Sequence, residues 1–317
     1  MSKAFVFPGQ GSQSVGMGQA LAAAFPSARA VFAEVDEALG QNLSLLMFEG
    51  PQAELTLTAN TQPAVFAVSL AVVRVLEAES GLNLANDAAF VAGHSLGEYS
   101  ALAAAGSLSI GEAAKLLRIR GLAMQAAVPV GTGAMAALFG LDSDAAQGIA
   151  KRAAAETGDG AICDVANDNG GGQFVLSGSV GAVHRAVEIA KEQGARRSVL
   201  LPVSAPFHCS LMQPAAEAMA EALISAEIKS PCVPLVSNVL AAPVADPDEI
   251  RKLLIAQVTG IVRWRESIAV MANSGISVFV ECGAGKVLSG LVRRIAPSTS
   301  GISIGVPDDI ELYRALR

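Results

Sequence analysis

The sequence is poor in charged and aromatic residues. Charged residues make up 16% of its 317 positions and aromatic residues 4%, whereas hydrophobic residues make up 52%. A chain this apolar can bury a large core, which excludes an intrinsically disordered protein. Its length allows one large α/β domain or two unequal ones.

Cysteine spacing and net charge exclude several further classes. The four cysteines lie far apart and form no C-x-x-C pair, so we exclude a disulfide scaffold and a cysteine zinc site and expect a cytoplasmic protein. The formal net charge of −7 argues against a nucleic-acid partner. Pro, Gly, Asn, Gln or Thr interrupts each long uncharged stretch, and we expect no membrane span.

A nucleotide site is also disfavoured. Gly9-Gln10-Gly11 follows an expected first strand at residues 4–7, but Ser14 stands where the dinucleotide fingerprint needs its third glycine. No G-x-x-x-x-G-K-[ST] motif occurs in the sequence either. The loop still places backbone N–H donors at the carboxyl end of a strand.

The sequence does contain Gly93-His94-Ser95-Leu96-Gly97, between an apolar run at 88–92 and an Ala-rich run at 98–105. The first run predicts a buried strand and the second a helix. A serine between two glycines at such a junction fits a nucleophile elbow, because small residues permit the sharp turn. The alternative is an ordinary strand–turn–helix, but the context favours Ser95 as a nucleophile.

A second informative residue lies on the helix expected from the capping box Ser109-Ile110-Gly111-Glu112 to about Pro129. Arg120 falls within the apolar stripe of this helix, whereas Arg118 faces the polar side. A guanidinium directed at the core needs an anion beside it. Periodicity leaves open whether that anion is an internal carboxylate or a substrate.

The order of the predicted elements divides the chain. Residues 131–201 predict the order β-α-β-β-α-β, which is typical of a ferredoxin-like subdomain. We expect it to be inserted into a larger α/β, hydrolase-like domain with a mostly parallel sheet, made of residues 1–130 and 202–317. The segment after Pro297 gives little signal.

An activated serine needs a base, and the chain has three histidines. We expect His94 to pack away from Ser95, because neighbouring side chains diverge at a turn, and His184 to face solvent on a helix. His208 lies in a Pro-containing loop at a helix start, after an expected main-domain strand, and it follows the serine as in α/β-hydrolases. We therefore predict His208 as the base, against the alternative of a hydrogen-bonded loop histidine. The residues alone do not identify the group that orients it, since no Asp or Glu stands at an obvious main-domain strand end.

Four segments together resemble one family, and they are Phe7-Pro8-Gly9-Gln10-Gly11-Ser12-Gln13, Gly93-His94-Ser95-Leu96-Gly97-Glu98, Arg120 and Pro206-Phe207-His208. From Phe5 to about Ile295 the chain is similar to the malonyl-CoA:acyl carrier protein transacylases of bacterial fatty acid synthesis, and to polyketide synthase acyltransferase domains. Phe207 stands where some members carry Ser. In polyketide acyltransferases a Phe there accompanies malonyl rather than methylmalonyl choice.

The resemblance implies roles for individual residues. It makes Ser95 the nucleophile and His208 the base. Arg120, which lies 25 positions after the serine (120 − 95), would bind the malonyl carboxylate. The main-chain carbonyl of Gln257 would orient the histidine, which would explain why no acid was found.

The resemblance also implies an activity. The enzyme would move a malonyl group from malonyl-CoA to the phosphopantetheine thiol of acyl carrier protein through a malonyl-Ser95 ester, in ping-pong fashion and without a metal or redox cofactor. The backbone N–H groups of Gln10 and Leu96 would form its oxyanion hole. We expect a monomer. Since the family's carrier protein is acidic, docking would need a local basic patch, for which the candidates are Lys286, Arg293, Arg294, Arg196 and Arg197.

Other functions could use the same residues. A thioesterase or esterase would pair Ser95 and His208 with water as the acceptor, and would hold Arg120 in an internal pair away from the serine. A trans-acting polyketide acyltransferase would differ in its pathway rather than its chemistry. A non-catalytic scaffold would keep the fold with an exposed, unreactive Ser95.

Overall fold

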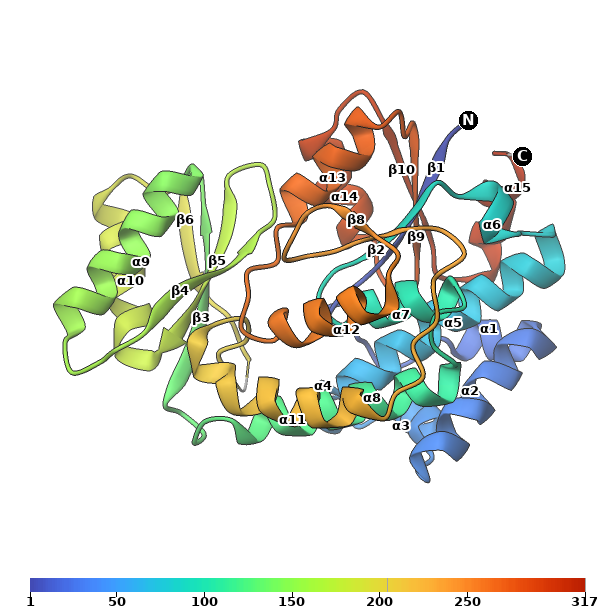
Figure 1. Cartoon of the computed structure of the whole chain (residues 1–317), viewed down its shortest axis with the longest axis horizontal. Helices are drawn as coiled ribbons and strands as arrows, with labels where there is room; N and C mark the ends of the chain where they lie inside the picture. The colour runs from blue at the N-terminus through green and yellow to red at the C-terminus, as the bar shows by residue number, and fades with distance from the viewer. Residues whose placement is uncertain (204, 317) are drawn as a thin grey trace.

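The computed structural model describes residues 1–203 and 205–316. Figure 1 shows two parts side by side, a larger one that contains both chain termini and a smaller one with its own sheet. Two positions of the predicted large domain (residues 1–130 and 202–317) lie outside the described residues, namely Ser204 and Arg317.

The larger part is built on a six-stranded sheet. Its order is β10-β9-β1-β2-β7-β8, and the neighbouring pairs are parallel except β7 with β8. Its strands are β1 (Lys3–Phe7), β2 (Phe90–Gly93), β7 (Leu235–Val236), β8 (Pro243–Val244), β9 (Val278–Cys282) and β10 (Ser300–Ile304). The predicted α/β class with a mostly parallel sheet is confirmed.

Helices cover both faces of this sheet, because its strands are apolar on both sides. In β1 the side chains of Phe5 and Phe7 join one core, with α2, α5, α7, α8 and α11, while Ala4 and Val6 join another, with α13 and α14. The helices of the larger part are α1 (Gln19–Ala24), α2 (Pro26–Leu39), α3 (Leu43–Glu49), α4 (Gln52–Thr56), α5 (Thr58–Ser80), α6 (Leu84–Asp87), α7 (Gly97–Ala104), α8 (Ile110–Ala126), α11 (Gln213–Ile224), α12 (Pro247–Ala256), α13 (Trp264–Asn273), α14 (Val287–Ile295) and α15 (Ile310–Arg314).

The central helix α5 has the length and composition of a membrane span. It is the one helix among residues 1–203 and 205–316 that passes such a test, and 94% of its most apolar window is buried inside the protein. Its apolar surface is therefore covered by the core. α8 crosses it closely, because a side chain at Gly121 would lie 2.7 Å from the Cα of Ala59.

The smaller part is a four-stranded antiparallel sheet with the order β4-β5-β3-β6. Its helices α9 and α10 share one core with its strands and lie together on one face in Figure 1. Its elements are β3 (Gly133–Phe139), α9 (Ser143–Thr157), β4 (Cys163–Asp168), β5 (Gln173–Ser179), α10 (Val180–Glu192) and β6 (Arg197–Leu200).

The two parts meet along the end of β4. Asn167 forms a parallel bridge with Val262, and the backbone N–H of Asp168 donates to the Val262 carbonyl at 3.0 Å. The Asp168 carboxylate also accepts from Arg265 Nε at 2.8 Å. These contacts fix the smaller sheet against the segment that leads into α13.

The structure corrects one prediction and fills one gap. The strand before His208 is β6, which belongs to the smaller sheet and not to the main domain, because it pairs with β3. The segment after Pro297, which gave little signal, supplies the parallel edge strand β10 and helix α15. Tyr313 of α15 packs its ring 6.1 Å from that of Phe5.

A buried acid fixes α14 on the sheet. The Glu281 carboxylate, at the end of β9, accepts from the backbone N–H groups of Leu288 and Ser289 at 3.0 and 2.8 Å, and from Ser303 Oγ at 2.9 Å. Its side chain is fully buried. It therefore satisfies the first N–H groups of α14, which no intrahelical carbonyl can reach.

Replacing Glu281 by Gln should lower the free energy of unfolding by about 2 kcal/mol, because an amide nitrogen cannot accept these N–H bonds. Chemical denaturation followed by circular dichroism measures the change. Glu221→Gln, on the exposed face of α11, is the matched control and should change stability by less than about 0.5 kcal/mol. Equal effects would contradict the capping role of Glu281.

Candidate active site

Ser95 lies at the carboxyl ends of β1 and β2, in the tight turn between β2 and α7. A side chain at Gly93 would lie 1.8 Å from the backbone of Gly97, and one at Gly97 would lie 2.3 Å from the carbonyl of Phe7. Only glycine fits at either position, as the sequence predicted. The turn holds Ser95 at a φ of 53°, so its side chain projects from the junction.

His208 reaches the serine from the other side. Its Nε2 lies 2.7 Å from Ser95 Oγ, and its Nδ1 lies 2.9 Å from the main-chain carbonyl of Gln257. A carbonyl can only accept, so Nδ1 carries the proton and Nε2 is free to accept from the serine hydroxyl. The structure thus brings together the serine, histidine and carbonyl named from the sequence.

The loop of His208 is held from both parts of the molecule. The Asp164 carboxylate of β4 accepts from Ser210 N at 3.0 Å and Ser210 Oγ at 2.9 Å. His208 itself has a φ of 57°. Ser95 and His208 are two of four non-glycine residues with positive φ in the described chain, so both partners of this pair have a backbone conformation that side chains disfavour.

Burial keeps the histidine neutral. His208 is 4% exposed; burial lowers its pKa to about 3, and the positive charge of Arg120 acts in the same direction. A neutral imidazole is ready to accept a proton over a wide range of pH.

Arg120 lies directly beside the serine. Its Nη2 donates to Ser95 Oγ at 3.0 Å and to Gln257 Oε1 at 2.8 Å, and its Nη1 donates to Gln62 Oε1 at 2.9 Å. The side chain is 1% exposed, and its Nε has no hydrogen-bond partner among the described residues. Within that same part of the chain it forms no salt bridge, so its partners are neutral oxygens.

The first loop lies against the turn that holds Ser95. A side chain at Gly9 would lie 2.8 Å from the carbonyl of His94, and one at Gly97 would lie 3.0 Å from the carbonyl of Pro8. Gln10 follows in this loop, and its side chain donates to Thr58 Oγ1 at 3.3 Å. Leu96 follows Ser95 directly and precedes the first turn of α7.

The other two histidines lie apart from the chemistry, as predicted. His94 points away from the serine, with its Nε2 3.0 Å from Asn169 Oδ1 and its ring 5.6 Å from that of Trp264. Burial lowers the pKa of His94. His184 is exposed on α10.

Sequence reasoning missed three residues of this site. Gln62 holds Arg120, while Glu98 and Asn238 lie beneath the turn that holds Ser95. Glu98 and Gln62 did leave a signal, because each is a polar residue within an apolar helical run. Asn238 left none, since it follows a two-residue strand.

Comparison with known proteins places the chain in a family. Residues 4–303 match the family described as acyl transferase domain. Malonyl CoA-acyl carrier protein transacylase of Bacillus subtilis (strain 168) is 46% identical over 313 residues, which cover 98% of this chain and 96% of that protein.

Solved structures agree with the sequence comparison. The acyl-carrier-protein-S-malonyltransferase of Bartonella henselae superposes with a TM-score of 0.96 at 54% identity, covering 100% of this chain and 99% of the other. A malonyl-transacylase solved in complex with a type II PKS acyl-carrier protein gives a TM-score of 0.94 at 39% identity, with 100% of both chains covered. The resemblance seen in the sequence is confirmed, and the chain belongs to the acyl transferase family.

Proposed function

We propose that this protein transfers malonyl groups from malonyl-CoA to the phosphopantetheine thiol of acyl carrier protein, in fatty acid biosynthesis. The observation that carries the proposal is the contact of a buried guanidinium, Arg120, with the hydroxyl of a paired serine, Ser95. An acyl group bound at Ser95 would place a terminal carboxylate beside that charge. Relatives named for the same reaction, similar over nearly their whole length, support it.

In the first half-reaction His208 Nε2 takes the Ser95 proton while Oγ bonds to the malonyl thioester carbon. The resulting oxyanion accepts hydrogen bonds from the backbone N–H groups of Gln10 and Leu96, each worth on the order of 3 kcal/mol. The C–S bond then breaks, and the CoA sulfur takes the proton from His208. Malonyl-Ser95 and free CoA remain.

The second half-reaction runs the same steps with a new thiol. The phosphopantetheine thiol gives its proton to His208, and its sulfur attacks the ester carbon. The C–Oγ bond breaks, and Ser95 regains the proton. The imidazolium formed in each half is stabilised by the Gln257 carbonyl dipole, which has less charge than the carboxylate of a full triad.

Two finer features of the fold belong to this proposal. We assign the strand–serine–helix turn as a hydrolase-like nucleophile elbow, supported by the glycine contacts and the positive φ of Ser95. We assign residues 131–201 as a ferredoxin-like subdomain inserted into a large domain of residues 1–130 and 202–317. The strand order β4-β5-β3-β6, with two helices on one face, supports the second assignment.

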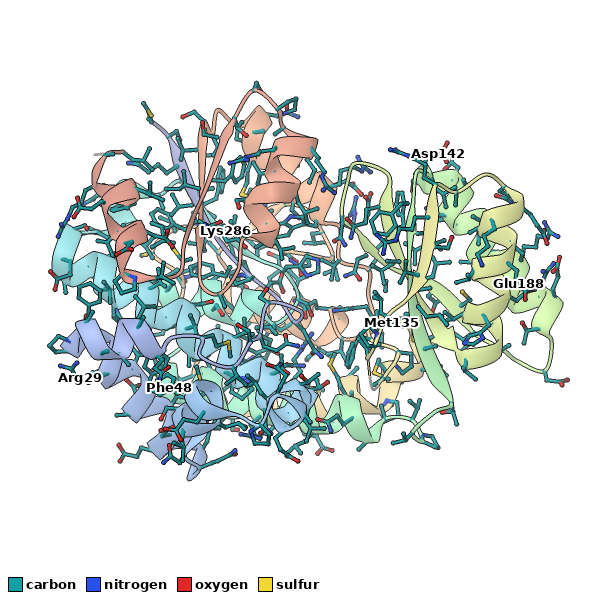
Figure 2. The ribbon with its side chains drawn as sticks, turned by 180° about the vertical axis from the view of Figure 1, so that it is seen from behind. Arg29, Phe48, Met135, Asp142, Glu188 and Lys286 are labelled. Carbon is teal, nitrogen blue, oxygen red and sulfur yellow. The ribbon has the colours of Figure 1, made fainter. Side chains whose placement is uncertain are left out.

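Carrier protein would dock on a basic surface that crosses both parts. Five exposed basic residues form this surface. Those on α14 or next to it are Lys286, Arg293 and Arg294, and those on β6 or next to it are Arg196 and Arg197. The turn at 170–172 joins the two groups, since Gly171 adjoins the stem of Arg294, Gly140 adjoins Arg196, and Gly140 N donates to Gly172 O at 2.8 Å. Figure 2 shows Lys286 on the larger part, with Asp142 and Glu188 on the smaller.

The remaining parts of the proposal follow from this chemistry. Acyl and proton transfer between Ser95, His208 and two thiols need no metal or redox cofactor, and we propose a cytoplasmic monomer. The contact between Arg120 and Ser95 favours this function over a thioesterase, for which Arg120 would be paired elsewhere. The pathway could also be that of a polyketide, since the chemistry is the same.

Incubation with malonyl-CoA should add one malonyl group to the protein, and peptide mapping should place it on Ser95. Intact-mass spectrometry measures the adduct, and added acyl carrier protein should remove it. Ser95→Ala should acquire no adduct. An adduct that water removes as fast as carrier protein would identify a thioesterase instead.

The Ser95 nucleophile should keep its reactivity in mild acid. With a pKa of about 3, His208 stays deprotonated as pH falls, so inactivation by a neutral sulfonyl fluoride should slow less than about twofold between pH 8 and pH 5.5. A histidine at the ordinary value of 6.5 would slow about tenfold. Inactivation rates across this range, with folding checked by circular dichroism, decide between them.

Arg120→Ala should invert acyl preference. A malonyl carboxylate would lose its counter-charge at a cost of about 3 kcal/mol, whereas an acetyl group never uses that bond. Self-acylation kinetics with malonyl-CoA and acetyl-CoA measure the ratio. Arg120→Lys should restore it only in part, because an ammonium lacks the planar fork. Arg118→Ala, whose guanidinium contacts Asn60 and Gln41 instead, should leave the ratio unchanged; equal losses for both acyl groups in Arg120→Ala would make Arg120 structural.

Transfer to carrier protein should weaken with salt more steeply than self-acylation by malonyl-CoA does, because docking of an acidic protein adds screened charge pairs. Paired substitution of Arg294 and Arg196 by Ala should flatten that dependence. Stopped-flow measurement of each half-reaction at rising ionic strength gives the comparison. Equal salt dependence of both halves would remove the basic surface from the account.

A further inference from the structure

Glu98 is a buried acid three residues after the nucleophile, in the first turn of α7. It is 1% exposed, yet the proposed mechanism does not use it. One carboxylate oxygen accepts from the backbone N–H of Asn238, and the other accepts from Gln257 Nε2 at 2.6 Å. Both oxygens thus act as acceptors.

Asn238 and Gln257 carry these contacts into the site. The Asn238 side chain accepts from Ser95 N at 2.8 Å and donates to the Gly93 carbonyl at 2.7 Å. Gln257 Nε2 also donates to the Ser95 carbonyl at 2.9 Å. Glu98 therefore anchors two side chains that bind the elbow on both sides of the nucleophile.

The orientation of the Gln257 side-chain amide decides which of its two atoms faces Arg120. Its nitrogen faces two groups that only accept, the Glu98 carboxylate and the Ser95 carbonyl. Its oxygen is therefore left for Arg120 Nη2, at 2.8 Å. A reversed amide would present its NH₂ group to the guanidinium and its oxygen to two acceptors.

We propose that Glu98 is a positioning residue for acyl selection, because its acceptor-only carboxylate fixes the orientation of the Gln257 amide and, through it, the guanidinium of Arg120. The proposal rests on the proposed function, in which Arg120 binds the malonyl carboxylate. Within the described part of the chain, Glu98 forms no hydrogen bond or salt bridge with Arg120. It acts through Gln257.

Glu98→Gln keeps the shape of the side chain but halves the number of oxygens that can accept hydrogen bonds. The glutamine has the same size as glutamate, but only its oxygen can accept, and the backbone N–H of Asn238, which cannot turn, keeps that oxygen. The new NH₂ group then faces Gln257 Nε2, and rotation of the Gln257 amide relieves that conflict and removes the acceptor from Arg120. Glu98→Gln should therefore disturb malonyl transfer more than acetyl transfer.

The test is the ratio of kcat/KM for malonyl-CoA to that for acetyl-CoA in self-acylation. Assays at about pH 9 keep Glu98 ionised, since burial raises its pKa to about 8. Glu98→Gln should lower the ratio about tenfold, and Glu98→Asp should lie between it and wild type. Glu281→Gln, which replaces an equally buried acid at the N-terminus of α14, should leave the ratio unchanged.

The pH dependence of the same ratio distinguishes a positioning role from a purely structural one, which would leave the ratio independent of the ionisation of Glu98. The wild-type ratio should rise with pH through about 8 as Glu98 ionises, while that of Glu98→Gln stays flat. The ionisable groups that face this site are Arg120, Tyr99 and His208. Burial raises the pKa of Tyr99 far above this range, His208 is already neutral, and Arg120 keeps its charge.

Several outcomes would overturn the proposal. One is a Glu98→Gln enzyme that slows both acyl groups equally, and another is a ratio that still falls when Glu98→Gln is added to Arg120→Ala, since the effect must pass through Arg120. If Glu98→Gln does not fold, Glu98→Asp decides, and an unchanged ratio there also overturns it. A wild-type protein that transfers no malonyl group would instead refute the proposed function.

Discussion

The site depends on one buried positive charge that forms no salt bridge in the described chain. Burying a guanidinium costs several kcal/mol unless an anion compensates it. Here Arg120 is held by the oxygens of Gln62, Ser95 and Gln257, which come from α5, the turn between β2 and α7, and the end of α12. These neutral acceptors satisfy its hydrogen bonds without cancelling its charge. In the proposed function, an acyl group that ends in a carboxylate would supply that anionic partner, and its carbonyl would then lie at Ser95.

The rest of the fold holds Arg120 and Ser95 in fixed positions relative to each other. Gly93 and Gly97 admit a turn that no larger residue could make, and the parallel strands β1 and β2 place the first loop and the Ser95 turn side by side at their carboxyl ends. His208 comes from a loop that the smaller sheet restrains through Asp164. The strained backbone at Ser95 and His208 persists because both sheets and their helices fix it.

Much of this site could be predicted from the sequence, because its chemistry is local. The elbow needs two glycines and a serine within five residues, and Arg120 interrupts an apolar stripe on its own helix. The orienting carbonyl of Gln257 belongs to the backbone, which every residue has, so only the resemblance indicated it. Glu98 and Asn238 act through contacts between residues 140 positions apart, and no local pattern encodes such a distance. The expectation that His208 follows a main-domain strand was wrong, because the last strand before it, β6, is the closing strand of the predicted segment 131–201 and pairs with β3.

The claim that Arg120 selects the acyl group is tested most directly by measuring thioester binding to a variant that cannot be acylated. Isothermal titration calorimetry of Ser95→Ala should show that malonyl-CoA binds about tenfold or more tightly than acetyl-CoA, because its carboxylate reaches the guanidinium. Adding Arg120→Ala should abolish that difference. Equal affinity for the two thioesters in Ser95→Ala, or a difference that survives the loss of Arg120, would contradict the account.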